Sequence, residues 1–171
     1  MADEPEFDAE ALIRVLVEAE VRFVLIGGFA AVIHGSPYVT TDLDVVPETT
    51  PANFERLSEA LDQLGARVWS QSTPEGLPFS HDAASLASVA IWNLVTDHGR
   101  LDVTLTPSGT AGFGDLIRDA EHLTIFGLEI DVASLADVVR SKEAADREKD
   151  RIVLPVLRRI LSESRGQDPA S

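Results

Sequence analysis

The stretch that decides the fold of this chain is residues 23–46, FVLIGGFAAVIHGSPYVTTDLDVV. Residues 22–26 form a short apolar run that ends at Gly27-Gly28, a pattern that predicts a buried strand. Residues 29–34 are again apolar and end at Gly35, as expected for a short helix with a glycine C-cap. Residues 41–46 predict a second strand, so the sequence indicates strand, helix and strand in close succession.

Two aspartates on the second of these strands give the strongest chemical signal. Asp42 and Asp44 flank Leu43, and the period of two places both carboxylates on one face while Leu43 and Val45 point into the core. The strand rise holds the two Cα atoms about 7 Å apart, and carboxylates that close repel each other unless a cation lies between them. Oxygen ligands of this kind suit Mg²⁺ or Mn²⁺. Alternatively, Asp-Leu-Asp is the solvated face of an edge strand.

A third aspartate, Asp102, lies in the run Leu101-Asp102-Val103-Thr104-Leu105. The three apolar residues would fill the core face and leave Asp102 and Thr104 opposite. If this strand pairs beside residues 41–46, Asp102 completes a triad that could hold one or two metal ions, as needed for an in-line phosphoryl displacement. On its own, Asp102 could equally be a solvated strand residue.

The glycine pair Gly27-Gly28 lies where the first strand passes into the short helix, 14 residues ahead of Asp42. Glycines allow the backbone to approach a ligand closely, and a helix N-terminus offers unpaired amides to a phosphate. The alternative is a simple turn. The pair therefore becomes informative only together with the aspartates that follow it.

The rest of the chain alternates helical and strand patterns and is expected to form one domain over residues 7–163. We predict flexible ends, an acidic one over 1–6 and a tail over 164–171.

Helices are expected over 7–20, from Thr50-Pro51 to Gly65, over 112–120, from Ser134 onward, and over 147–161 with a kink or restart at Pro155. Strands are expected over 66–70 and in two hairpins, 88–95 with 100–106 and 122–125 with 128–132; residues 73–80, rich in proline and glycine, predict a loop. The expected fold class is α/β (α+β), a mixed sheet with flanking helices and a helical C-terminal segment.

The 171 residues have a formal net charge of −15, which by itself argues against a nucleic-acid partner. The charge is uneven, because residues 140–165 contain 8 basic and 5 acidic residues while residues 1–139 contain 6 basic and 23 acidic ones. No apolar run approaches the roughly 20 residues of a membrane span. The chain has no cysteine, and its start lacks the pattern of a secretory signal, so a cytoplasmic location is the default expectation.

The order Gly27-Gly28, then Asp42-Leu43-Asp44, then a later aspartate resembles the nucleotidyltransferase superfamily related to DNA polymerase beta. The His34-Gly35 pair and the acid-rich strand look most like its small bacterial branch that includes AbiEii-type toxins. The resemblance implies that Asp42, Asp44 and Asp102 bind Mg²⁺ (or Mn²⁺) and perform catalysis, with Asp102 orienting or deprotonating the acceptor. It also implies nucleotide binding, at the residues Gly27, Gly28, Thr41, Lys142 and Lys149, the last of these within the basic run 147–151.

The resemblance implies an Mg²⁺-dependent enzyme that transfers a nucleoside monophosphate from a nucleoside triphosphate to an acceptor hydroxyl of a tRNA or a protein. The resemblance further suggests a bacterial toxin with a cognate antitoxin as its partner. The basic segment 140–165 could contact tRNA, or it could be a solvated helix face in which the bases pair with nearby acids. Two alternatives remain, an inactive nucleotidyltransferase-like binding protein and a metal-dependent phosphohydrolase.

Overall fold

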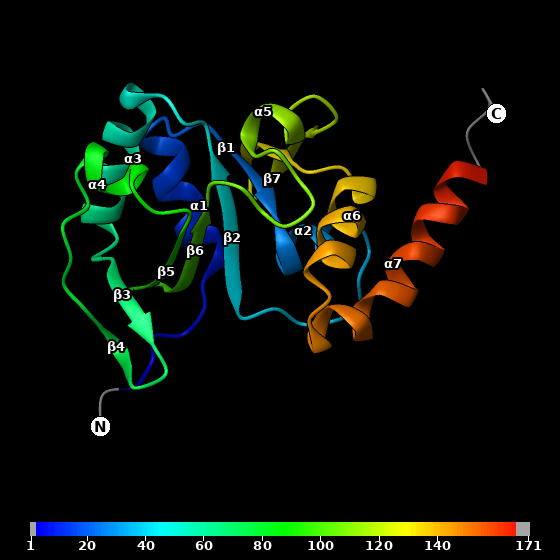
Figure 1. Ribbon diagram of the computed structural model, residues 1–171, viewed down its shortest axis with the longest axis horizontal. Coiled ribbons are helices and arrows are strands. Elements are labelled where there is room, and N and C mark those ends of the chain that lie inside the picture. The colour runs from blue at the N-terminus through cyan, green and yellow to red at the C-terminus, as the bar shows by residue number, and fades with distance from the viewer. Residues whose placement is uncertain (1–2, 167–171) are drawn as a thin grey trace.

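A computed structural model describes residues 3–166 and shows one mixed sheet with helices around it (Figure 1). The eight strands stand in the order β4-β3-β5-β6-β2-β1-β8-β7. Their bounds are β1 Phe23–Ile26, β2 Asp42–Pro47, β3 Arg67–Ser70, β4 Thr73–Leu77, β5 Ile91–Thr96, β6 Gly99–Thr104, β7 Glu121–Ile125 and β8 Leu128–Val132. The helices are α1 Ala9–Glu18, α2 Gly27–Ile33, α3 Pro51–Gln63, α4 Ala83–Ala87, α5 Phe113–Leu116, α6 Leu135–Ala145 and α7 Glu148–Gly166.

The centre of the sheet is the trio β6, β2 and β1. Strand β2 runs parallel to β6 and antiparallel to β1, and β1 in turn runs parallel to β8. Strand β2 is therefore an interior strand, which rules out the alternative that Asp-Leu-Asp lies on an edge strand. The fold class expected from the sequence, a mixed sheet with flanking helices, is confirmed.

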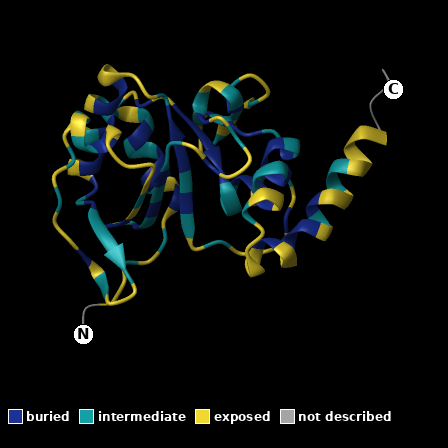
Figure 2. Ribbon diagram, in the orientation of Figure 1, coloured by how far each residue is buried: buried dark blue, intermediate teal, exposed yellow. Residues whose placement is uncertain are grey.

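The core lies where α1 and α3 pack against the central strands. Leu12 and Leu16 of α1 and Leu57 and Leu61 of α3 are all fully buried, as is Leu43 of β2. All four residues of β1 are buried as well. Figure 2 shows this dark band through the middle of the sheet, whereas the far half of α7 is largely exposed. Burial of these apolar side chains is the main favourable term in folding.

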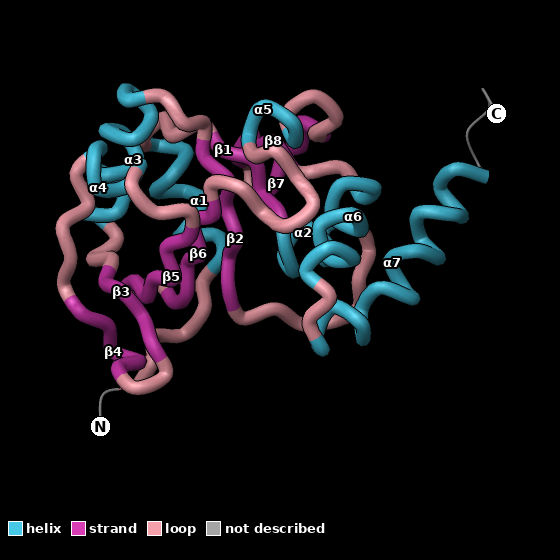
Figure 3. The backbone as a smooth tube through the Cα atoms, in the orientation of Figure 1, coloured by secondary structure: helices cyan, strands magenta, loops and turns pink. Residues whose placement is uncertain are grey.

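Residues 73–80 correct one expectation, because Thr73–Leu77 form strand β4 rather than a loop (Figure 3). The strand pairs antiparallel with β3 and lies at the edge of the sheet, where a proline such as Pro74 is tolerated. Gly76 adopts a positive φ of 84°, and the register with β3 shifts between Val68 and Ser70. Proline and glycine here mark an irregular edge strand.

Three helices differ from their expected bounds. The short helix α4 is absent from the sequence prediction, and α5 covers only the first part of the expected 112–120. Helix α7 continues through Pro155, whose exposed position lets the ring face away from the core. Because α7 extends to Gly166, the first three residues of the expected tail are helical, while 167–171 and residues 1–2 lie outside the described residues.

In the described part of the chain, no helix is both long enough and apolar enough to cross a membrane.

A buried asparagine of α3 forms hydrogen bonds to the backbone beside the sheet. The side chain of Asn53 is fully buried, accepts a hydrogen bond from the Arg22 amide at 2.8 Å, and donates to the carbonyl oxygens of Arg22 at 2.9 Å and Glu48 at 2.8 Å. Thr50 caps the same helix by accepting from the Asn53 amide. One side chain thus satisfies backbone groups just outside β1 and β2.

Replacing Asn53 by alanine leaves the Arg22 amide and the Glu48 carbonyl without this partner, while the Arg22 carbonyl keeps its hydrogen bond from the Glu48 amide. Asn53→Ala should therefore destabilise the fold by about 3 kcal/mol. Urea unfolding followed by circular dichroism measures this. The control is Asn93→Ala, since Asn93 is exposed on β5. Equal midpoints for the two variants would contradict the role given to Asn53.

Candidate active site

Three carboxylates converge at the centre of the sheet. In the parallel pairing of β2 with β6, Asp44 lies opposite Asp102 and Asp42 lies opposite Arg100. Leu43, Val45, Leu101 and Val103 alternate with them and are buried on the other face. Asp42, Asp44 and Asp102 each offer an oxygen within 4.8 Å of the other two. The triad that the sequence made conditional on strand pairing is therefore formed.

The electrostatics of the triad show how crowded its negative charge is. Burial, reinforced by the charges of Asp42 and Asp102, raises the pKa of Asp44 to about 7. The pKa of Asp102 rises to about 6, again through burial first and Asp42 second, with Arg100 acting in the opposite direction. A divalent cation at this point would remove the repulsion. The donor set, three carboxylates with no nitrogen or sulfur, suits Mg²⁺ or Mn²⁺.

The glycine pair forms the first two residues of α2, which begins directly after β1 and two residues earlier than expected, and this glycine turn lies against β2. Gly27 has a φ of 76°, and a Cβ there would collide with the carboxylate of Asp44. A Cβ on Gly28 would come within 2.8 Å of the Thr40 hydroxyl. At Gly27 the positive φ and the contact with Asp44 both require glycine, whereas a side chain at Gly28 would require the Thr40 side chain to shift. Residue 26, the N-cap, makes no side-chain hydrogen bond, so no side chain caps the first amides of α2.

Thr40, one residue before the predicted Thr41, is the threonine that faces the site. Its hydroxyl donates to the carbonyl oxygen of Asp42 at 3.2 Å and lies 3.1 Å from Asp42 Oδ1. Thr40 lines the cleft, whereas Thr41 is exposed and does not. The alternation that places Asp42 and Asp44 on one face extends back to residue 40, a signal that was available in the sequence.

Asp42 and Asp44 open into a cleft of about 440 Å³, and Asp102 lies beside them but is not one of the residues that line the cleft. Its floor includes Gly27, Gly28, Asp42 and Asp44, and one wall carries the basic side chains of α6 and α7. Arg147, from the basic run 147–151 that the resemblance pointed to, also lines the cleft. Five further lining residues were not expected from the sequence, namely Ser36, Tyr38, Ile91, Thr104 and Ser108. Among these five, the sequence pattern offered a signal only for Thr104, which shares the face of Asp102 on β6.

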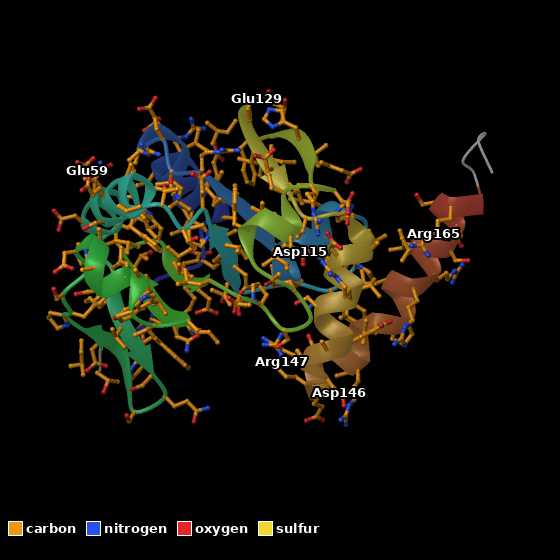
Figure 4. The ribbon with its side chains drawn as sticks, turned by 45° about the horizontal axis from the view of Figure 1, so that its top comes forward. Glu59, Asp115, Glu129, Asp146, Arg147 and Arg165 are labelled. Carbon is orange, nitrogen blue, oxygen red and sulfur yellow. The ribbon has the colours of Figure 1, made fainter. Side chains whose placement is uncertain are left out.

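The basic wall consists of Lys142, Arg147 and Lys149. Figure 4 shows Arg147 where α6 meets α7. Asp146 allows this corner by adopting the left-handed conformation, with a φ of 49°. Both Lys142 and Lys149 lower the pKa of Asp44, so their charges act across the cleft on the triad. The wall therefore faces the acids that it partly neutralises.

Asp150 holds two members of this wall in place. It is fully buried, lies 3.4 Å from Lys142 Nζ, and accepts from Arg147 Nε at 2.8 Å and from the Arg147 amide at 3.2 Å. Burial alone would raise the pKa of Asp150, but the hydrogen bonds and charge of Arg147, with the charge of Lys142, bring it below its usual value. Lys149 is exposed and, among residues 3–166, forms no ion pair.

Comparisons with known proteins agree with this geometry at the level of fold. A scan of family models and a search of curated proteins found no match. Among solved structures, the lincosamide antibiotic adenylyltransferase LnuA, bound to lincomycin, superposes with a TM-score of 0.59 at 14% identity over 91% of this chain and 99% of that chain. A Thermotoga maritima protein described as a nucleotidyltransferase, TM1012, gives 0.47 at 16% identity over 92% of this chain and 97% of that chain. The mixed sheet with its flanking helices is a nucleotidyltransferase fold, as the sequence resemblance implied.

The raised pKa of Asp44 makes the stability of the metal-free chain depend on pH. A carboxyl group whose pKa is about 7 in the folded chain, against an ordinary value of 3.8, contributes stability that is fully present below pH 3.8 and is lost as the pH rises through 7. In EDTA at pH 8, Asp44→Asn should therefore melt about 4–8 °C above the unaltered chain, a gain of about 2 kcal/mol. The gain should shrink toward pH 5.

Thermal melts by circular dichroism at pH 5, 6.5 and 8 measure this difference. Asp62→Asn is the control, because the Asp62 side chain is 84% exposed. A gain in melting temperature for Asp44→Asn that is the same at all three pH values would show that ionisation of the buried Asp44 carboxyl is not its cause.

Proposed function

We propose that this chain is a metal-dependent nucleotidyltransferase, which moves a nucleoside monophosphate from a nucleoside triphosphate to an acceptor hydroxyl. The observation that supports this best is the convergence of Asp42, Asp44 and Asp102 opposite the basic wall of one cleft. A site that is acidic at one side and basic at the other suits a metal-bound polyphosphate. The fold shared with an adenylyltransferase adds support at low sequence identity.

The three carboxylates would hold one or two Mg²⁺ or Mn²⁺ ions. Such ions supply charge neutralisation at the triphosphate and at the oxygens that attack and leave. The fit rests on the oxygen-only donor set, on the distance within which the ligand atoms lie, and on the raised pKa of Asp44 that a cation would relieve. The glycine turn, kept free of side chains beside Asp44, leaves space for phosphate oxygens.

The reaction follows from these positions. The acceptor oxygen forms a bond to the α-phosphorus, the bond from this phosphorus to the bridging oxygen of the β-phosphate breaks, and pyrophosphate leaves. Asp102 takes the proton of the acceptor hydroxyl or orients that hydroxyl for attack. Lys142, Arg147 and Lys149 contact the negative oxygens of the triphosphate. Catalysis of this type depends on positioning and on charge neutralisation.

The charge pairing of the basic segment favours an acceptor other than RNA. Six of its side chains form ion pairs with carboxylates of this chain, namely Arg140, Lys142, Arg147, Arg151, Arg158 and Arg159. Within the described residues, only Lys149 and Arg165 of residues 140–165 lack such a partner. RNA binding depends on cations that are free to contact phosphates. We therefore favour a hydroxyl of a protein or of a small molecule over that of a tRNA.

The finer identity remains part of the proposal. The AbiEii-type branch, a toxin role, a cognate antitoxin and a cytoplasmic location rest on the sequence resemblance and default expectations. LnuA acts on a lincosamide antibiotic, and a small hydroxylated molecule is accordingly one acceptor to test here.

The decisive experiment is transfer of label from each of the four α-³²P nucleoside triphosphates with Mg²⁺ or Mn²⁺. The acceptors supplied are total tRNA, the chain itself and lincomycin. Asp42→Asn should reduce transfer by at least about 100-fold, because it removes a charge at the reacting centre. Asp62→Asn, at an exposed acid remote from the triad, should retain it.

The outcomes separate the alternatives. Label transferred to an acceptor supports the enzyme, and release of free nucleoside monophosphate without an acceptor product indicates a phosphohydrolase. No turnover with any nucleotide, together with unchanged nucleotide binding by Asp42→Asn, would leave only the inactive binding protein.

Lys149 should act mainly in binding the triphosphate. Lys149→Met removes an unpaired cation of the basic wall and should raise the KM for the nucleotide about tenfold with a smaller change in kcat, a loss of about 1.4 kcal/mol in binding. The control is Arg165→Met, because Arg165 also lacks an ion-pair partner among residues 3–166 but lies near the far end of α7 (Figure 4). If both variants raise KM equally, general charge and not the position of Lys149 is responsible.

A further inference from the structure

The guanidinium group of Arg100 is fixed by contacts to three strands beside the triad. On its own strand β6, Arg100 Nη2 donates to Asp102 Oδ1 at 3.3 Å. On β5, the carbonyl oxygen of Leu94 accepts from Arg100 Nε at 3.1 Å. On β3, the ring of Trp69 lies under the guanidinium, with Cζ 3.6 Å from the ring centroid. A planar group held at its face and at two of its donors has little freedom to move.

The pair formed by Arg100 and Asp102 is well shielded from water. Both side chains are 14% exposed, whereas the surface pair Arg151–Asp146 leaves 65% and 62% of its side chains exposed. A shielded pair is screened less by salt and keeps one geometry, whereas an exposed pair loosens readily. The Arg100–Asp102 contact therefore constrains Asp102.

The contact uses one oxygen of Asp102 and leaves the other available. Oδ1 accepts from Arg100, and the Asp102 carboxyl also lies within hydrogen-bonding reach of Asp42, its neighbour in the triad. Because a carboxylate rotates about a single bond, fixing one oxygen also fixes where the other points. Asp102 lies opposite Asp44 in the strand register, so its second oxygen is held on the side of the triad.

We propose that Arg100, supported by the ring of Trp69, is a positioning residue that orients Asp102 for metal binding. The inference rests on the proposed function, because it takes the triad as the metal site. It adds a side chain that binds no metal and belongs to neither the glycine turn nor the basic wall. Trp69 takes part through the face of its ring, on which the guanidinium stacks.

Two effects of Arg100 on the metal have opposite signs, and this makes the inference testable. As a positive charge near a cation site, Arg100 weakens metal binding by Coulomb repulsion. As the group that orients a ligand, it strengthens binding, and loss of such outer partners lowers metal affinity by roughly 10–100-fold. Removal of Arg100 therefore tightens binding if only charge matters and weakens it if orientation dominates.

The experiment measures Mn²⁺ binding to the full chain without nucleotide, by electron paramagnetic resonance of the free ion. We expect Arg100→Met to weaken binding about tenfold. Arg100→Lys keeps the charge but has no planar fork to stack and donate, so it should also weaken binding. Trp69→Leu should weaken binding to a smaller extent, and Trp69→Phe, which retains an aromatic face, should restore most of the affinity.

The matched control is Arg67→Met, because Arg67 is also a sheet arginine but pairs with Asp97 away from the triad. Circular dichroism melts confirm that each variant is folded, and the two Trp69 variants test the inference even if Arg100→Met fails to fold. Unchanged or tighter Mn²⁺ binding by Arg100→Met and Arg100→Lys would overturn it. If the unaltered chain binds Mn²⁺ but transfers no nucleotide, the proposed function fails while this inference stands. If the unaltered chain binds no Mn²⁺, both fail.

Discussion

The repulsion among three carboxylates that one strand pairing forces together is the constraint on which the site depends. The parallel register of β2 with β6 brings Asp42, Asp44 and Asp102 within 4.8 Å of one another, while the leucines and valines between them hold the same strands in the core. The strands cannot separate to relieve the charge without exposing that core. The repulsion is instead offset by cations, Arg100 at one side and the α6–α7 wall at the other.

The glycine turn and the basic corner both follow from the need to approach this charged centre. The turn from β1 to α2 contacts the carboxylate of Asp44, and only a residue without a side chain fits there. The corner between α6 and α7 brings Lys142 and Arg147 together on the buried Asp150. Lys142 and Arg147 are thus held by a carboxylate that is not part of the triad. The acids of this chain serve two purposes, to build the site and to hold the cations that face it.

Features that depend on local spacing, such as the face of a strand on which a residue lies, were predicted from the sequence. Features that depend on which distant strands pair were not decided by it. The period of two placed Asp42 and Asp44 on one face, and the apolar runs located the central strands. The convergence with Asp102 depended on whether β6 pairs with β2, which no local pattern decides. Thr41 was selected from the motif alone, whereas the alternation itself indicated Thr40. Strand β4 was missed because proline and glycine are as compatible with an edge strand as with a loop.

The role of Arg100 was beyond sequence reasoning for a similar reason. Its three contacts come from β3, β5 and β6, and the spacing of Arg100 and Asp102 reveals only one of them. The basic segment is the opposite case, because the sequence shows both its excess of positive charge and the nearby acids that could pair with it, and the fold shows that six of its eight basic side chains form such pairs.

Those internal ion pairs bear on how a nucleotide would reach the cleft. With a net charge of −15 and most cations already paired, the long-range field of the chain is negative, and attraction is confined to the few ångströms around the basic wall. A nucleoside triphosphate, itself an anion, would be repelled at a distance and attracted only on arrival. At physiological ionic strength, dissolved salt screens the long-range repulsion beyond about 8 Å. The same salt weakens the short-range attraction at the basic wall much less. Association of the nucleotide would then become faster as ionic strength rises, the reverse of electrostatic steering.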